Sequence, residues 1–214
     1  MEARLAALEE KVVALEKKAP AGPASSAEEE AANAVMKDVT EATKNMDYAT
    51  AKAKLQELMT KHGNTKAGKA ADRMYKEVGL VGTDAKAIEV EKWYQGKAAL
   101  GESKATLLVF WEVWCPHCKR EMPELAKREG DLKAKGIAVV GLTKITKSAS
   151  EEKVLEFMKE SDINFPMAKE KDGSMSEAYN VSGIPAAALV KDGKVIWRGH
   201  PGRLDDATLD KLVN

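Results

Sequence analysis

Residues 106–119, with the sequence TLLVFWEVWCPHCK, place a short apolar run directly before two cysteines. The run from 106 to 111 is continuous and apolar, which predicts a buried strand. Residues 119–135 then show the charge and apolar spacing of a helix. Cys115 and Cys118 are the only cysteines in the chain. The order of strand, Cys-x-x-Cys and helix therefore predicts a redox-active dithiol.

A metal site is the first alternative to a dithiol. A structural zinc site needs four ligands, and the sequence has no second Cys-x-x-Cys pair. Its three histidines are His62, His117 and His200, of which His117 lies inside the motif and the other two stand apart. The sequence therefore predicts no zinc site. Cu(I) bound by the two thiolates stays open, because soft sulfur ligands suit that ion.

Composition narrows the classes of protein further. Lysine plus arginine and aspartate plus glutamate each number 34, and this zero formal charge argues against a nucleic-acid surface. No apolar run approaches the length of a transmembrane helix. The chain opens on a charged helical pattern and not on a secretory signal, although a processed chain would look the same.

Residues 1–18 carry a heptad pattern. In this pattern arginine and lysine occupy heptad position g, and glutamate occupies position e. In a parallel assembly the basic residues of one helix face the glutamates of the next, so we expect a parallel homo-oligomer, with a trimer favoured over a dimer. An amphipathic tail that docks on its own domain is the alternative, because isolated helices this short are marginal. The apolar seam consists of Met1, Leu5, Leu8, Val12 and Leu15.

Residues 19–26 read as a linker, since the prolines end the first helix and nothing in this stretch can form a core. Residues 27–82 predict an all-helical segment. Part of it is similar to a single degenerate tetratricopeptide hairpin, but a helical spacer is the favoured interpretation, because such arrays normally need three repeats. The predicted helices span 27–44, 47–62 and 66–79.

Residues 90–214 predict an α/β domain. We expect it to begin with a short hairpin at 93–100 and to continue with a βαβ unit. A second β-hairpin, turning at 191–193, and a final helix at 204–213 would complete it. This is the element order of a thioredoxin fold. The other predicted strands span 105–111, 137–142, 165–168, 185–190 and 194–198, and the other helices span 116–134 and 150–160.

The same segment resembles a thioredoxin-like domain of the TlpA/ResA type. Residues 107–123 and 183–186 carry the resemblance, which covers somewhat more than half of the chain. It implies a central mixed sheet flanked by helices, and a cis peptide bond at Ile184–Pro185 facing the cysteines. The dipeptide between the cysteines, Pro116-His117, is similar to that of DsbA-type oxidants.

The resemblance also assigns acid–base roles. Thioredoxins place a buried aspartate six residues before the first cysteine, where this chain has Val109. Glu121, six residues after Cys115, instead matches the active-site glutamate of ResA-like proteins. It would relay the proton of Cys118. The alternative is that Glu121 is an ordinary exposed residue of the helix.

The chemistry of the motif suggests a different role for each cysteine. Cys115, at a helix N-terminus, would be the attacking thiolate, since free N–H groups there favour an anion. Pro116 suits the first helical turn, and His117 could add positive charge or a hydrogen bond. Cys118 would be the resolving thiol. The residues expected to contact a client peptide, by backbone pairing, are Trp114, Pro116, Ile184 and Pro185.

The sequence therefore predicts a thiol–disulfide oxidoreductase that acts on protein cysteines. It would need no cofactor beyond its own Cys115–Cys118 disulfide. Oligomerisation favours an isomerase or reductase over a DsbA-like oxidase, and a Cu(I)-binding protein or an adaptor is the alternative of another class. We expect cysteine-containing clients, an unidentified redox partner, and an extracytoplasmic location such as the bacterial periplasm, with the cytoplasm left open.

Overall fold

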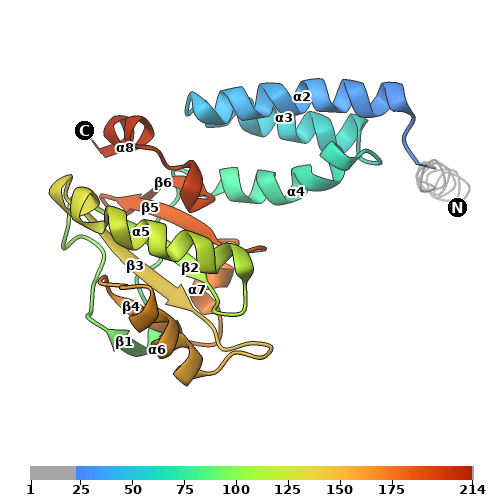
Figure 1. Ribbon diagram of the computed structural model, residues 1–214. Helices are drawn as coiled ribbons and strands as arrows, with labels where there is room; N and C mark the ends of the chain where they lie inside the picture. Colours follow the sequence, from blue (N-terminus) through green and yellow to red (C-terminus); the bar gives the residue numbers. More distant parts are fainter. Residues whose placement is uncertain (1–22, 214) are drawn as a thin grey trace, which may run out of the picture. The chain divides into compact units, whose positions relative to one another are not determined.

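The computed structural model describes residues 23–213 (Figure 1). The predicted heptad helix at 1–18 lies outside the described residues, as does the first part of the linker at 19–26. The chain divides into two compact units, and the division falls between Tyr75 and Lys76. The first unit is helical and the second contains the sheet, so each is described separately.

The helical unit contains the three predicted helices within two residues of their expected ends. The first begins with a capping box, in which Ser25 accepts from the Glu28 N–H and the Glu28 carboxylate accepts from the Ser25 N–H. Asp47 caps the second by accepting from the Thr50 N–H. Buried alanines, together with Val39 and Leu55, line their inner faces. The helices are α2 (Ser26–Lys44), α3 (Tyr48–Lys61) and α4 (Lys66–Gly79), whose last turn belongs to the second unit.

The second unit is built on a six-stranded mixed sheet with the strand order β1-β4-β3-β2-β5-β6 (Figure 1). The central strand β2 is parallel to β3 and antiparallel to β5, and every residue of β2 is buried. A strand covered on both faces explains why its sequence is continuously apolar and not alternating. The strands are β1 (Val90–Gln95), β2 (Ala105–Trp111), β3 (Ile137–Thr143), β4 (Met167–Glu170), β5 (Ala186–Lys191) and β6 (Lys194–Gly199).

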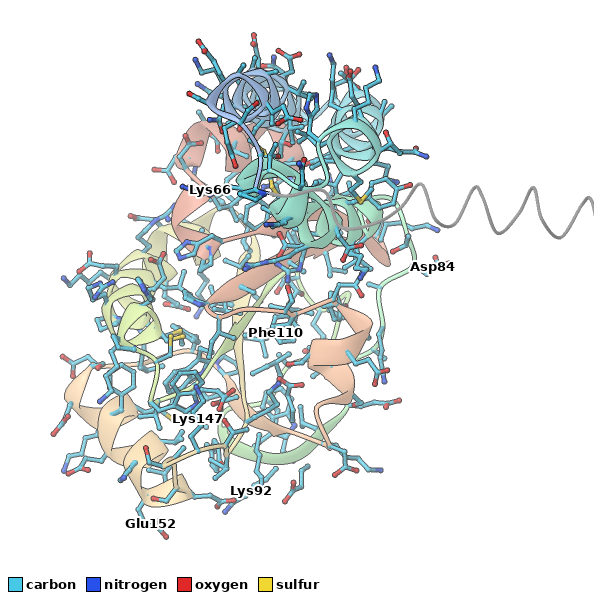
Figure 2. All side chains as sticks on the ribbon, turned by 90° about the vertical axis from the view of Figure 1, so that its right-hand side faces the viewer. Lys66, Asp84, Lys92, Phe110, Lys147 and Glu152 are labelled. Atoms are coloured by element: carbon cyan, nitrogen blue, oxygen red, sulfur yellow. The ribbon has the colours of Figure 1, made fainter. Side chains whose placement is uncertain are left out.

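Alternate residues of β2 contribute to two cores. Val109 and Trp111 belong to the core that includes buried residues of α5, α6 and α8, while Phe110 belongs to the core that includes α7. Phe110 is labelled inside the sheet unit in Figure 2. The mixed sheet flanked by helices confirms the predicted fold class. The helices are α5 (Pro116–Ala134), α6 (Glu151–Glu160), α7 (Ser174–Ala178) and α8 (Asp206–Val213), and a short 3₁₀ helix spans Pro201–Arg203.

The predicted hairpin at 93–100 is wrong. Only one strand forms there, β1, and it pairs antiparallel with β4 at the edge of the sheet. The local sequence pattern favoured pairing with an adjacent segment of the chain, whereas the strand that pairs with β1 lies more than 70 residues away in the sequence. The segment before position 90 also belongs to this unit, because Gly82, Thr83 and Ala85 form backbone hydrogen bonds with the β6 hairpin.

Candidate active site

Cys115 lies at the N-terminus of α5. It is the N-cap residue, and its carbonyl accepts the first helical hydrogen bond, from the Lys119 N–H, at 3.0 Å. Pro116 takes the first helical position, where a missing N–H costs nothing. The thiol is free and 4% exposed. The free N–H groups of the first turn therefore lie beside a sulfur that can become an anion.

Cys118 lies one turn further into the helix. Its side chain is also a free thiol, but it is fully buried. Burial, the largest influence, raises the pKa of Cys118 well above its ordinary value, and a backbone contact from Glu112 only partly opposes this. The two thiols therefore differ in access to solvent, and Cys118 is held in its protonated form at neutral pH.

The loop before β5 faces the first cysteine. The Ile184–Pro185 peptide bond is cis, as the resemblance implied, and the Cys115 thiol lies 3.6 Å from the Ile184 carbonyl oxygen, to which it donates. The buried Arg198 of β6 secures this loop, since its guanidinium donates to the Tyr179 and Asn180 carbonyls at 2.9 and 3.3 Å. A carbonyl acceptor and an almost buried thiol are thereby held against one another.

His117 is exposed and turned towards the helix, where its Nδ1 lies 2.7 Å from an Arg120 nitrogen. Arginine has only donors, so Nδ1 is the acceptor in this pair. No hydrogen bond joins His117 to Cys115 within the part of the chain that the structure describes. His117 therefore contacts Arg120, and its suggested effect on the Cys115 thiolate stays a prediction.

Glu121 is half-buried and therefore differs from a freely solvated residue of the helix. Its carboxylate packs against Gly202 in the 3₁₀ turn, where a Cβ on that glycine would lie 2.9 Å from Oε1. The same Cβ would lie 3.3 Å from His200 Nδ1. The glycine thus leaves room for a carboxylate and an imidazole side by side. Within residues 23–213, Glu121 makes no hydrogen bond to Cys118.

The structure adds a residue that the sequence analysis missed. Glu112 lies between β2 and the cysteines and is only 5% exposed. Its carboxylate accepts from the Trp114 indole N–H at 2.6 Å and from the Thr146 hydroxyl. The available signal was a single charged residue in an otherwise apolar run from 105 to 115. A buried carboxylate needs such donors, because desolvation without them is costly.

Trp114 is consequently fixed on two sides. Besides its bond to Glu112, its indole N–H lies 3.1 Å from Thr146 Oγ1. The Lys147 ammonium lies 3.2 Å from the centroid of the Trp114 ring, a cation–π contact, in the region where Figure 2 labels Lys147. Trp114 also borders a cleft of about 310 Å³ whose lining includes Val113 and Phe157. The half-buried ring of the residue next to Cys115 therefore forms part of the lining of a cleft.

Residues 23–213 contain neither a cluster of potential metal ligands nor a helix that could span a membrane. In that range no three His, Cys, Asp or Glu side chains come together as metal ligands. None of the helices in the same range has both the length and the apolar character needed to cross a membrane.

The fold and the site define a thioredoxin-fold protein with a Cys-x-x-Cys centre. Residues 81–198, more than half of the chain, match the AhpC/TSA family. The chain belongs to that family. The match begins near the start of the sheet unit and ends in β6, and it includes both cysteines.

Curated relatives agree with this class. The chain is 32% identical over 111 residues to the thiol-disulfide oxidoreductase ResA of Oceanobacillus iheyensis, covering 52% of this chain and 55% of ResA. It is 30% identical over 142 residues to the thioredoxin-like protein YneN of Bacillus subtilis, covering 65% and 82%. The chain thus spans about half the length of the ResA relative.

Solved structures show the same fold. The thioredoxin domain of a thiol-disulfide oxidoreductase from Bacteroides vulgatus superposes with a TM-score of 0.54 at 26% identity, over 63% of this chain and 98% of that one. A putative thiol:disulfide interchange protein DsbE from Chlorobium tepidum gives a TM-score of 0.54 at 22% identity, over 63% and 98%. The second likeness concerns the fold alone.

The raised pKa of Cys118 predicts a loss of stability at alkaline pH. The unfolded chain releases this proton near the ordinary value of 9.0, whereas the folded protein retains it. The stability present below that pH is therefore lost as pH rises, by up to about 1.4 kcal/mol per pH unit. The measurement is the free energy of unfolding of Cys115→Ser against pH, from denaturant titrations.

The control for this measurement is the double variant Cys115→Ser/Cys118→Ala, which has no thiol and retains the tyrosines. We expect its stability to fall less steeply above about pH 9. Equal slopes for the two variants would show that Cys118 ionises as easily in the folded protein as in the unfolded chain.

Proposed function

We propose that this protein is a thiol–disulfide oxidoreductase acting on protein cysteines through Cys115 and Cys118. One observation carries the proposal: an almost buried thiol at a helix N-terminus, 3.6 Å from the Ile184 carbonyl, with a fully buried thiol one turn behind it. The similarity to oxidoreductases such as ResA supports the same chemistry. No cofactor is required, since the electrons are held by the cysteine pair itself.

The reductive direction proceeds in two exchanges. The Cys115 thiolate attacks one sulfur of a client disulfide, forms a mixed disulfide and releases the other client sulfur as a thiolate. Cys118 then loses its proton and attacks the Cys115 sulfur, which releases the second client thiolate and leaves the Cys115–Cys118 disulfide. Two electrons pass from the protein to the client, and the reverse sequence oxidises a client dithiol. An unidentified redox partner restores the starting state.

Client binding would use the surface around these sulfurs. Backbone of the Ile184–Pro185 loop would pair with an extended client segment, with Trp114 and Pro116 beside the reacting cysteine. The cleft next to Trp114 offers room for a neighbouring client side chain. Holding the client backbone in this way would orient its sulfur towards Cys115.

The second exchange needs a base, because Cys118 must lose a proton that burial holds in place. We assign this role to Glu121, which is half-buried three residues after Cys118 and rests in the recess at Gly202. A water molecule or a small movement of the side chain would have to connect Glu121 to the thiol. Its half-buried position supports the choice of Glu121 over a fully exposed glutamate.

The heptad pattern at residues 1–18 indicates the type of exchange. A parallel trimer or dimer would gather several dithiols around one client, which suits an isomerase or reductase better than a DsbA-like oxidase. Such chemistry belongs in compartments where protein disulfides persist, so we place the protein outside the cytoplasm, as in a bacterial periplasm.

Substitution of the cysteines tests the proposed roles. Cys115→Ser should reduce disulfide exchange to the uncatalysed rate, because the attacking sulfur is gone. Cys118→Ala should instead accumulate mixed disulfides with clients, because nothing resolves them. Non-reducing electrophoresis after mild oxidation measures the trapped species. Stoichiometric Cu(I) retention by the unaltered protein, without any reduction of insulin, would favour the metal-binding alternative.

Deleting residues 1–18 tests the assembly. The shortened protein should be a folded monomer by light scattering, and it should retain simple dithiol exchange while losing most of its ability to reshuffle a scrambled disulfide substrate. The reason is that neighbouring dithiols raise the effective concentration of a second thiol near a captured client. A monomer with full isomerase activity would refute the link between assembly and function.

A further inference from the structure

A buried carboxylate lies beside the dithiol, and the exchange reactions above do not use it. Glu112 directly follows β2, and its side chain is 5% exposed. Trp114 and Thr146, both neutral, donate to the same carboxylate oxygen, Oε2. Two donors suit an ionised carboxylate, which is an acceptor only. The site therefore provides for a negative charge on a side chain that is almost fully buried.

No ion pair between Glu112 and a lysine, arginine or histidine occurs among residues 23–213. The Lys147 ammonium contacts the ring of Trp114, whose indole N–H donates to Glu112. Lys147 is exposed, so solvent weakens its field, whereas the Glu112 charge acts through protein interior. The negative charge is therefore only partly compensated.

The same residue is connected to both cysteines through its backbone. The Glu112 carbonyl accepts from the Cys115 N–H at 3.1 Å, and its main chain also contacts Cys118. Both sulfurs are almost or fully buried. A charge in this setting interacts with a thiolate far more strongly than it would in water.

We propose that Glu112 is a positioning and tuning residue: its carboxylate fixes Trp114 beside Cys115, and its charge makes the Cys115–Cys118 couple more reducing. The proposal rests on the proposed function, since it requires a redox couple at these cysteines. It concerns the direction of electron flow, and it favours the reductase or isomerase over the oxidase.

The direction in which Glu112 shifts the redox potential follows from the charges of the two redox states. The disulfide is neutral, whereas the reduced pair carries a negative charge whenever Cys115 is a thiolate. A fixed carboxylate disfavours that charged state and leaves the disulfide unaffected, so the reduced protein gives up its two electrons more readily. The redox potential is measured from an exchange equilibrium with glutathione. In that reaction the reduced protein and glutathione disulfide are converted to the oxidised protein and two molecules of reduced glutathione.

The test is the equilibrium constant of that reaction for the full-length protein and for Glu112→Gln. The amide retains an oxygen that accepts from Trp114 but removes the charge. We expect the variant to favour the reduced protein on the order of tenfold more strongly, which corresponds to a potential about 30 mV higher. Alkylation of free thiols followed by mass spectrometry measures the ratio of the two forms.

Glu112→Asp is the matched control. It shortens the side chain and disturbs the contact with Trp114, but it keeps the charge, so its potential should stay close to that of the unaltered protein. Tryptophan fluorescence reports the movement of Trp114 in both variants. If Glu112→Gln does not fold, Glu112→Met removes the charge at similar volume and is measured in the same way.

The outcomes separate the two proposals. An unchanged potential in Glu112→Gln would overturn the tuning role, and so would an equal shift in Glu112→Asp, which would attribute the effect to packing and not to charge. Failure of the unaltered protein to form a Cys115–Cys118 disulfide with glutathione would instead overturn the proposed function.

Discussion

The arrangement of the site depends on burial of two sulfurs at the junction of β2 and α5. The strand ends at Trp111, the helix begins at Pro116, and the Ile184 carbonyl accepts from the Cys115 thiol. The helix N-terminus favours an anion at Cys115, whereas burial opposes one at Cys118. One short segment thereby gives two identical side chains different surroundings.

Charges around this junction act in opposite directions. Arg120 pairs with His117 on the exposed side of the helix, while Glu112 is held by Trp114 and Thr146 on the buried side. Cations near the dithiol favour its thiolate, and anions disfavour it. The redox direction of a Cys-x-x-Cys centre therefore depends on the residues that surround the motif, and the dipeptide inside it is only one of them.

Much of the sheet unit could be predicted because its signals are local. The continuous apolar run of β2, the proline after Cys115 and the turn at Asp192-Gly193 each specify an element through neighbouring residues. Long-range pairing could not be predicted: β1 was expected in a hairpin but pairs with β4. The contacts of Glu112 with Thr146 and of Glu121 with Gly202 were missed for the same reason. A sequence shows a charged residue, but only the fold brings its partners to it.

The central claim is that Cys115 attacks and Cys118 resolves. The most direct measurement is the rate at which iodoacetamide modifies each thiol of the reduced protein at neutral pH, followed by mass spectrometry of the peptides. We expect Cys115 to react first and at least about tenfold faster, because it lies at the helix N-terminus and is the less buried of the two thiols. Equal rates, or faster modification of Cys118, would contradict it.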